Sequence, residues 1–227
     1  MPVTLVLTHG HVDHAGASFE YGECYVNPAD VALLYEHGDI DKRYGFVMGG
    51  GKPEGAFVPK KEDVVPPCAV KTLPVQDGDV FDLGGVQIEA IAVPGHTAGT
   101  MVYLDRARRV LYSGDACNAN TLLGLPCSTT VETYAKSLDH LATYLKGIDK
   151  FYGGHGLQAV PAYIVDEAMI LCEEILSDDD DRFETEFLGR KFLYARKFDG
   201  MFHREDGGIA NIAYVMAVSY THLRAHE

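Results

Sequence analysis

The sequence predicts an α+β fold in which blocks of strands, separated by helices, stack as a layered sandwich. Residues 71–113 form a strand-rich block, where short apolar and β-branched runs alternate with turns that contain Asp-Gly or Gly-Gly. A later segment predicts an amphipathic helix, because apolar side chains recur there at helical spacing: Tyr134, Leu138, Leu141 and Leu145. Strands come in groups and do not alternate singly with helices, which favours α+β over a regular βαβ arrangement.

The elements before the strand-rich block are short. Val3–Leu7 is an apolar, β-branched run that predicts a buried strand, and Cys24–Val26 predicts a second one. Asn27 followed by Pro28 is typical of a helix start, since the Asn side chain caps free N–H groups and proline tolerates the first helical position. We therefore expect a helix from residue 28 to about residue 37. Residues 38–67 contain consecutive glycines, several prolines and little periodicity, so we predict a mobile insertion or lid there.

The remaining elements follow from the same patterns. Thr129 and Glu132 predict a capping box at the start of the amphipathic helix, and a second helix is expected from Pro161 to about Leu176. An acidic linker is expected at residues 178–181. The expected strands are residues 72–75, 80–83, 86–93, 101–104, 109–113, 151–152, 183–187, 191–198 and 209–215.

Composition limits the class of protein. With 227 residues, 47% of them hydrophobic, the chain can bury one sizeable core, and we predict one domain over residues 1–217. The net charge of −14 repels polyanions, so we expect no nucleic-acid partner. Five cysteines without a C-x-x-C pair predict neither a disulfide framework nor a thiolate zinc site, which favours a cytoplasmic location. No apolar run approaches the ~20 residues that span a bilayer, so no membrane partner is expected.

Both ends of the chain are expected to be non-native. A single predicted strand precedes His9, and because a sheet needs more than one strand, we expect the first N-terminal strands to be missing. Residues 218–227 follow a predicted strand without turn chemistry, and they resemble the translation of a transposase sequencing adaptor. We interpret them as a foreign tail and exclude His222 and His226 from the site.

A dense group of metal-ligand residue types follows the first predicted strand. His9, His11, Asp13 and His14 fall within six residues. Imidazoles and carboxylates this close together are costly in a core unless each has a partner, and a metal ion is a partner for all of them. Imidazole and carboxylate donors without thiolate suit zinc or iron, and suit manganese less well.

Three further donors occur one at a time along the chain. His96, Asp115 and His155 each come just after an apolar predicted strand, in segments rich in glycine that let the backbone approach closely. We expect these loops and the His9–His14 loop to converge at one edge of a sheet, because a shared site explains all of them at once.

This pattern resembles the metallo-β-lactamase superfamily, whose signature is T-H-x-H-x-D-H-x-G followed by separate His, Asp and His residues. The match runs from Thr8 to Gly156. The resemblance implies an αββα sandwich and two divalent metal ions, with zinc favoured and iron or manganese as alternatives. It assigns His9, His11 and His96 to the first metal and Asp13, His14 and His155 to the second, with Asp115 bridging them. Thr8, Thr97 and Ser113 are candidates to orient the ligands.

The resemblance also implies the chemistry. Two cations would produce hydroxide from a bridging water near neutral pH and polarise the substrate's carbonyl or phosphoryl oxygen. Asp13 and Asp115 are the expected catalytic carboxylates, since they hold hydroxide and metals in place. Cys117 is interpreted as a small loop residue, because a thiol nucleophile needs a paired base.

Residue identities narrow the choice within the superfamily. β-Lactamases of the family replace the residue at the position of His14 or carry Cys or Ser at that of Asp115, and flavodiiron proteins carry Glu at that of His11. Nucleases share all the ligands but usually add basic surface. A hydrolase of a small thioester, lactone or ester therefore remains, similar to the glyoxalase II and lactonase branches. The alternatives are a mononuclear iron persulfide dioxygenase, a phosphodiesterase and a non-catalytic binding protein. We expect the substrate-pocket walls in residues 118–123 and 38–67.

The expected loss of N-terminal strands has a measurable consequence. The chain as written should bind metal weakly or express insolubly, whereas a chain that includes native upstream strands should bind two metals. Metal content of both purified chains, measured by inductively coupled plasma mass spectrometry, checks this expectation. Stoichiometric metal in a soluble preparation of the chain as written would contradict it.

Overall fold

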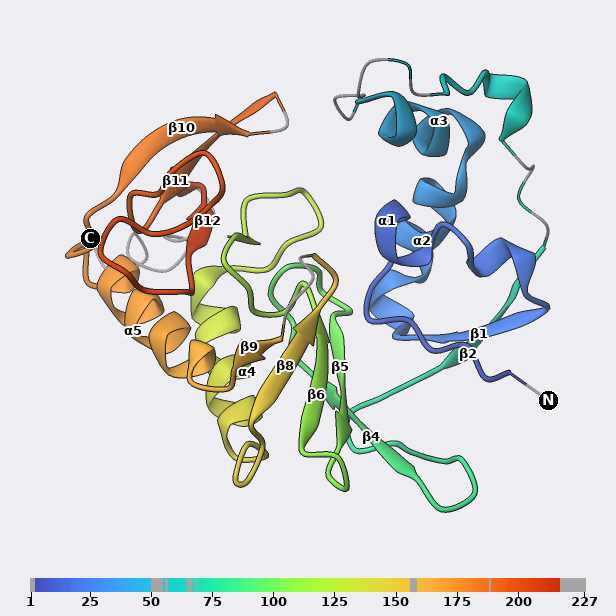
Figure 1. Ribbon diagram of the computed structural model, residues 1–227, viewed down its shortest axis with the longest axis horizontal. Helices are drawn as coiled ribbons and strands as arrows, with labels where there is room; N and C mark the ends of the chain where they lie inside the picture. Colours follow the sequence, from blue (N-terminus) through green and yellow to red (C-terminus); the bar gives the residue numbers. More distant parts are fainter. Residues whose placement is uncertain are drawn as a thin grey trace, which may run out of the picture. The chain divides into compact units, whose positions relative to one another are not determined.

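The structure is a computed structural model that describes residues 3–49, 55, 57–64, 67, 69–155, 159–187 and 189–216. The chain divides into two compact units, Met1–Val75 and Gln76–Glu227, which are described separately below (Figure 1). Among the described residues, no helix is long and apolar enough to cross a membrane. The predicted foreign tail, residues 218–227, lies outside the described residues, and the single domain over residues 1–217 stays a prediction.

The first unit contains short helices and a small parallel sheet. Its helices are α1 (Val12–Ala15), α2 (Val31–Gly38) and α3 (Ile40–Gly49), with 3₁₀ turns at Ser18–Glu20, Pro28–Asp30 and Lys61–Asp63. Strands β1 (Glu23–Val26) and β2 (Lys71–Pro74) pair in parallel. The run predicted as a first strand forms one bridge, from Val6 to Tyr25, and is otherwise outside the ladder. A small core holds the unit together: Leu7, Ala15, Phe19, Cys24, Val26, Leu34 and Val70.

Residues 38–67 contain a helix that the sequence pattern did not predict. The helix expected after Asn27 is present, since the Asn27 side chain accepts the Ala29 N–H and a 3₁₀ turn leads into α2. The lack of periodicity predicted no helix in residues 38–67, but Ile40–Gly49 form the ten-residue helix α3. The mobile insertion or lid stays a prediction. None of the side chains of α3 is buried, so the helix carries no apolar stripe for a periodicity argument to detect. Its start had a sequence signal, because the Asp39 side chain accepts the Asp41 N–H.

The second unit contains two mixed sheets. The six-stranded sheet has the order β3-β4-β5-β6-β8-β9, and all its neighbours are antiparallel except β6 and β8. Its strands are Val80–Asp82, Gln87–Ala92, Met101–Asp105, Val110–Gly114, Lys150–Gly153 and Val160–Pro161. The four-stranded sheet has the order β10-β11-β12-β7, with strands Phe183–Phe187, Arg190–Tyr194, Ile212–Tyr214 and Thr121–Leu122. Two mixed sheets with helices confirm the predicted α+β class.

Helices α4 (Val131–Ala142) and α5 (Ile164–Leu176) pack against each other and share one core with the sheets. The predicted stripe of α4 is confirmed, because Tyr134, Leu138 and Leu141 are fully buried. Figure 1 shows the two helices lying beside β8 and β9 of the same unit. The long strands and both helices therefore depend on the same apolar contacts.

Two predicted helix starts were misplaced. The N-cap of α4 is Thr130, whose side chain accepts the Thr133 N–H, and not Thr129. Thr129 instead donates its N–H to the Gly95 carbonyl. Pro161 belongs to β9, so α5 begins at Ile164. In both cases a residue type that often starts a helix was assigned to the helix. Thr129 and Pro161 instead belong to contacts with other parts of the fold.

The predicted C-terminal hairpin is confirmed with shorter strands. β10 and β11 pair antiparallel about Gly189, which has a φ of 71°. β11 ends at Tyr194, whereas the sequence predicted a strand to residue 198, and β12 covers only three residues of the predicted 209–215. Each strand ends where its neighbour stops pairing with it. The apolar pattern of one strand does not predict this, because it contains no information about the neighbour.

The packing of α4 predicts the effect of a cavity. Leu138→Ala should lower the free energy of unfolding by about 2–5 kcal/mol, because it removes buried methyl groups and leaves a void. Lys136→Ala, an exposed change on the same helix, should stay within about 0.5 kcal/mol of the original. Urea denaturation followed by circular dichroism measures both, and equal midpoints for the two variants would contradict the assigned core.

Candidate metal centre

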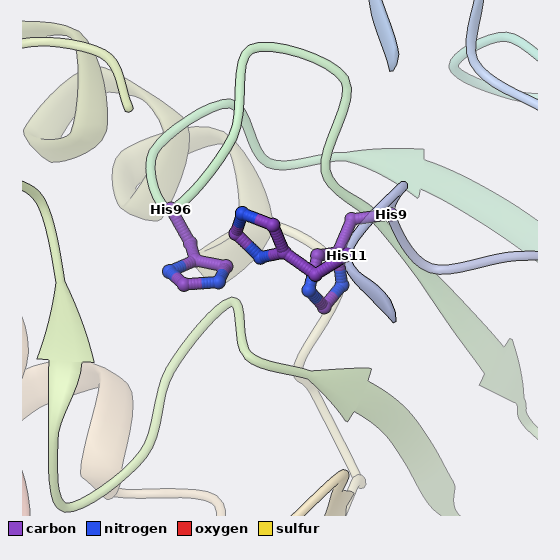
Figure 2. Close-up of side chains that lie close together, drawn as sticks. All are labelled: His9, His11 and His96. Carbon is purple, nitrogen blue, oxygen red and sulfur yellow. The ribbon is translucent and has the colours of Figure 1, made fainter. Parts of the chain in front are cut away.

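The first unit collects four of the predicted ligands in one loop. The His9 ring lies edge-on to the His11 ring, with centroids 4.9 Å apart, and its centroid is 4.1 Å from that of His14. The Asp13 Oδ2 atom is 3.6 Å from His14 Nε2. His9 and His11 lie just before α1, and Asp13 and His14 lie within it. Figure 2 draws His9 and His11 with His96, which belongs to the second unit.

A hydroxyl contacts one of these rings. The Thr8 Oγ1 atom lies 3.1 Å from His9 Nδ1, so one ring nitrogen of His9 has a partner from the adjacent residue. Such a contact orients an imidazole and selects which nitrogen presents its lone pair. The structure thus places Thr8 where a ligand-orienting residue is expected.

In the second unit, strand direction brings three ligand loops to one edge. β5 is antiparallel to both β4 and β6, and β8 is parallel to β6, so β4, β6 and β8 run in the same direction. Their C-terminal ends therefore lie at the same edge of the sheet. His96, Asp115 and His155 follow these ends, in the order of the strands.

The Asp115 carboxylate lies between two imidazoles. Its Oδ2 atom is 3.6 Å from His96 Nε2 and 3.2 Å from His155 Nε2. His96 and Asp115 are buried, whereas the His155 side chain is 59% exposed. The Asn118 amide donates to Asp115 Oδ1 at 3.4 Å. One carboxylate oxygen therefore faces both imidazole nitrogens, and its partner oxygen faces the following loop.

His96 is held by β7 and by the loop that joins β7 to α4. Its Nδ1 atom lies 3.0 Å from the Leu122 carbonyl oxygen, so the proton sits on Nδ1 and the Nε2 lone pair faces the Asp115 side. The Ser128 hydroxyl donates to the His96 carbonyl at 2.8 Å. The ring of His96 is thus held by β7, and its backbone is held by the loop that follows β7.

The other two predicted orienting hydroxyls bond to their own turns or strands. The Thr97 and Thr100 hydroxyls pair at 2.8 Å, and the Ser113 hydroxyl donates to the Tyr152 carbonyl at 3.4 Å. Ser113 therefore joins β6 to β8 beside the Asp115 loop.

Tyr134 supports two ligand loops from inside the core. Its hydroxyl donates to the Ala116 carbonyl at 2.8 Å, directly after Asp115. Its ring packs so closely on Gly95, directly before His96, that a Cβ atom there would lie 2.3 Å from the ring. The sequence showed Tyr134 only as a core residue, since neither contact has a local signal.

The donor set fits a divalent metal. The predicted ligands in each unit are imidazoles with carboxylates, and thiolate is absent from both sets, which suits zinc or iron by ligand softness. Cys117 is buried beside Asp115, with its Sγ atom 3.7 Å from the Ile164 carbonyl. Burial raises the pKa of the Cys117 thiol to about 12, which opposes a role as thiolate nucleophile or ligand.

Comparison with known families identifies the fold. The family model described as metallo-beta-lactamase superfamily matches residues 1–181. The chain belongs to the metallo-β-lactamase superfamily. The matched segment contains all seven predicted ligands.

Two curated relatives of known name are hydrolases. The chain is 30% identical over 161 residues to an acyl-coenzyme A thioesterase, MBLAC2, from Gallus gallus, covering 68% of this chain and 56% of that protein. It is 28% identical over 158 residues to a hydroxyacylglutathione hydrolase from Mesorhizobium japonicum, covering 68% of this chain and 48% of that protein. The chain thus spans about half the length of these relatives.

Solved structures share the fold. A metallo-β-lactamase family protein from Thermus thermophilus has a TM-score of 0.54 and 23% identity, covering 77% of this chain and 62% of that one. A metallo-β-lactamase from Pontibacter korlensis has a TM-score of 0.52 and 16% identity, covering 76% of this chain and 70% of that one. The predicted metallo-β-lactamase fold is confirmed.

Three other polar residues lie in ordinary surroundings. Tyr194 is fully buried among aromatic rings, and burial raises the pKa of its hydroxyl to about 12. Tyr163 and Lys197 are exposed. These three positions fit packing and solvent exposure.

The double contact of Tyr134 predicts a specific loss. Tyr134→Phe keeps the ring against Gly95 but leaves the buried Ala116 carbonyl without its donor, which should cost about 1–3 kcal/mol of folding free energy. Tyr163→Phe, at an exposed site, should change stability by less than about 0.5 kcal/mol. Thermal unfolding of both variants measures the difference, and a Tyr134→Phe chain as stable as the original would contradict the assigned bond.

Proposed function

We propose that this chain is a dinuclear metal-dependent hydrolase that cleaves the thioester bond of a small molecule. The observation that carries the proposal is the Asp115 carboxylate oxygen, which faces the Nε2 atoms of His96 and His155 at 3.6 and 3.2 Å. Imidazoles and carboxylates are ligand types that hold divalent metals such as zinc, and here they meet at the C-terminal edge of a sheet. The proposal favours zinc and expects no nucleic-acid partner.

The proposal assigns each ligand as the superfamily resemblance does. His9, His11 and His96 would hold the first metal, Asp13, His14 and His155 would hold the second, and Asp115 would be shared by both. Support comes from the grouping of ligands within each unit and from the intact signature in the segment matched by the family.

The chain's own residues provide position and charge. When bound, the metals supply hydroxide near neutral pH and polarise the substrate carbonyl. Asp115 and Asp13 place negative charge where the cations bind, and the Leu122 carbonyl holds the His96 ring in the required tautomer. Cys117 takes no part, because its thiol is buried and held protonated.

Two observations favour a thioester among the possible esters. The two named relatives are an acyl-coenzyme A thioesterase and a hydrolase of hydroxyacylglutathione, which is also an S-acyl compound. A thiol leaving group has a pKa of about 8.5, so it can depart as thiolate without a general acid. We therefore expect an acyl-coenzyme A or acylglutathione ester to be hydrolysed faster than a lactone or a phosphodiester.

An activity panel with a matched pair of variants tests the proposal. Zinc-loaded chain is assayed with an acyl-coenzyme A, an acylglutathione, a lactone and a nitrophenyl phosphodiester. The thiol released from the two thioesters is followed with a chromogenic reagent, the acid released from the lactone with a pH indicator, and nitrophenolate by its absorbance. Asp115→Asn should lower thioester kcat/KM about 10³-fold and reduce bound metal, because a metal centre supplies several kcal/mol of transition-state stabilisation. Asp105→Asn removes another buried carboxylate, at the end of β5 and so at the opposite edge of the sheet, and should keep metal and activity.

The outcomes separate the candidate functions. Two zinc ions per chain and thioester turnover support the proposal. One iron per chain with sulfide-dependent oxygen uptake would identify a persulfide dioxygenase, and turnover of the phosphodiester alone would identify a phosphodiesterase. Metal binding without turnover of any substrate would leave a binding protein and contradict the proposal.

A further inference from the structure

Asp30 lies at the start of α2, but its side chain bonds to the His9–His14 loop and does not cap the helix. It occupies the N-cap position of the helix, where an Asp side chain commonly accepts an N–H of the first turn, but it makes no such capping bond. Its Oδ2 atom instead accepts the Gly10 N–H at 2.9 Å, and the residue is only 1% exposed. A buried carboxylate is therefore directed at the backbone between His9 and His11.

The ligand loop lies directly against α2 at this point. A Cβ atom added to Gly10 would lie 2.9 Å from the Leu34 nitrogen and 3.0 Å from the Asp30 carbonyl oxygen. Both neighbours are backbone atoms, which cannot move aside as a flexible side chain can. Gly10 is thus required for close approach, and this approach brings its N–H within reach of Asp30.

His37 makes the matching contact from the other end of α2. Its Nδ1 atom accepts the Val12 N–H at 3.2 Å, and its ring lies beside the His11 ring with centroids 5.1 Å apart. Val12 is the first residue of α1, and the N–H of a first helical residue has no acceptor within the helix. His11 is the N-cap of α1 but makes no side-chain capping bond, so His37 provides the acceptor in its place.

We propose that Asp30 and His37 are positioning residues that anchor the two backbone N–H groups on either side of His11 and so orient this ligand before metal binds. α2 acts as a rigid support, because one short helix carries both acceptors, one near each end. The metal role of His11 rests on the proposed function, whereas the anchoring itself concerns backbone contacts within the first unit.

The first test measures the anchors in the metal-free full-length chain. Amide hydrogen exchange, followed by NMR, should become about 10-fold faster at Gly10 in Asp30→Ala and at Val12 in His37→Phe, because each loses one hydrogen bond. Asp30→Asn and His37→Asn keep an acceptor oxygen and should recover most of the protection. Tyr35→Phe is the matched control, since it removes a bond from the same helix to the Val70 carbonyl and should leave both amides unchanged.

The second test measures zinc affinity by competition with a chromophoric chelator. Asp30→Ala and His37→Phe should bind zinc about 10–100-fold more weakly, as is typical when a residue that supports a ligand is lost. Tyr35→Phe should bind zinc as the original chain does. The zinc affinities of Asp30→Asn and His37→Asn should lie between those of the original chain and of the variants without an acceptor.

The outcomes distinguish this inference from the proposed function. Unchanged exchange at Gly10 and Val12 in folded Asp30→Ala and His37→Phe would overturn the anchoring, whatever the chain hydrolyses. Equal loss of zinc affinity in Tyr35→Phe would also overturn it, because the loss would then reflect general stability. An original chain that binds no zinc would refute the proposed function, while the exchange measurement would still decide on the anchors.

Discussion

The parallel pairing of β6 with β8 is the constraint on which the second unit depends. Parallel neighbours cannot be joined by a tight turn, so the chain must leave the sheet after β6 and return in the same direction. Here the connection contains β7 and α4, and α4 supplies much of the core. The same pairing makes β6 and β8 end at one edge, which brings Asp115 and His155 together. The parallel pairing of β6 with β8 thus accounts both for the packing of α4 in the core and for the sheet edge where Asp115 and His155 meet.

The placement of the predicted ligands in each unit relies on contacts to backbone atoms. Tyr134 donates to the Ala116 carbonyl beside Asp115, Asp30 accepts the Gly10 N–H, and His37 accepts the Val12 N–H. Backbone groups are covalently close to the ligand side chains but are not themselves ligands. Holding them restricts where an imidazole or carboxylate can point without competing for its metal-binding atoms.

Much of the fold and the candidate site could be predicted, because their signals are local. The stripe of α4 marked Tyr134, Leu138 and Leu141 as core, and all are buried. The α+β class followed from grouped strands, and the superfamily from a short signature with its donors in order. Helix α3 was missed, because none of its residues is buried and amphipathic periodicity exists only where one face packs.

The sequence by itself determined the chemistry of the donors, their order after strands and the class of fold, since residue type and periodicity are local properties. Tertiary structure decided which strand ends share an edge, which threonine caps α4 and which acceptors serve the His11 loop. Asp30 and Gly10 are 20 residues apart in the chain, and His37 and Val12 are 25 apart. No local pattern relates such residues, because their pairing exists only once α2 packs against the loop.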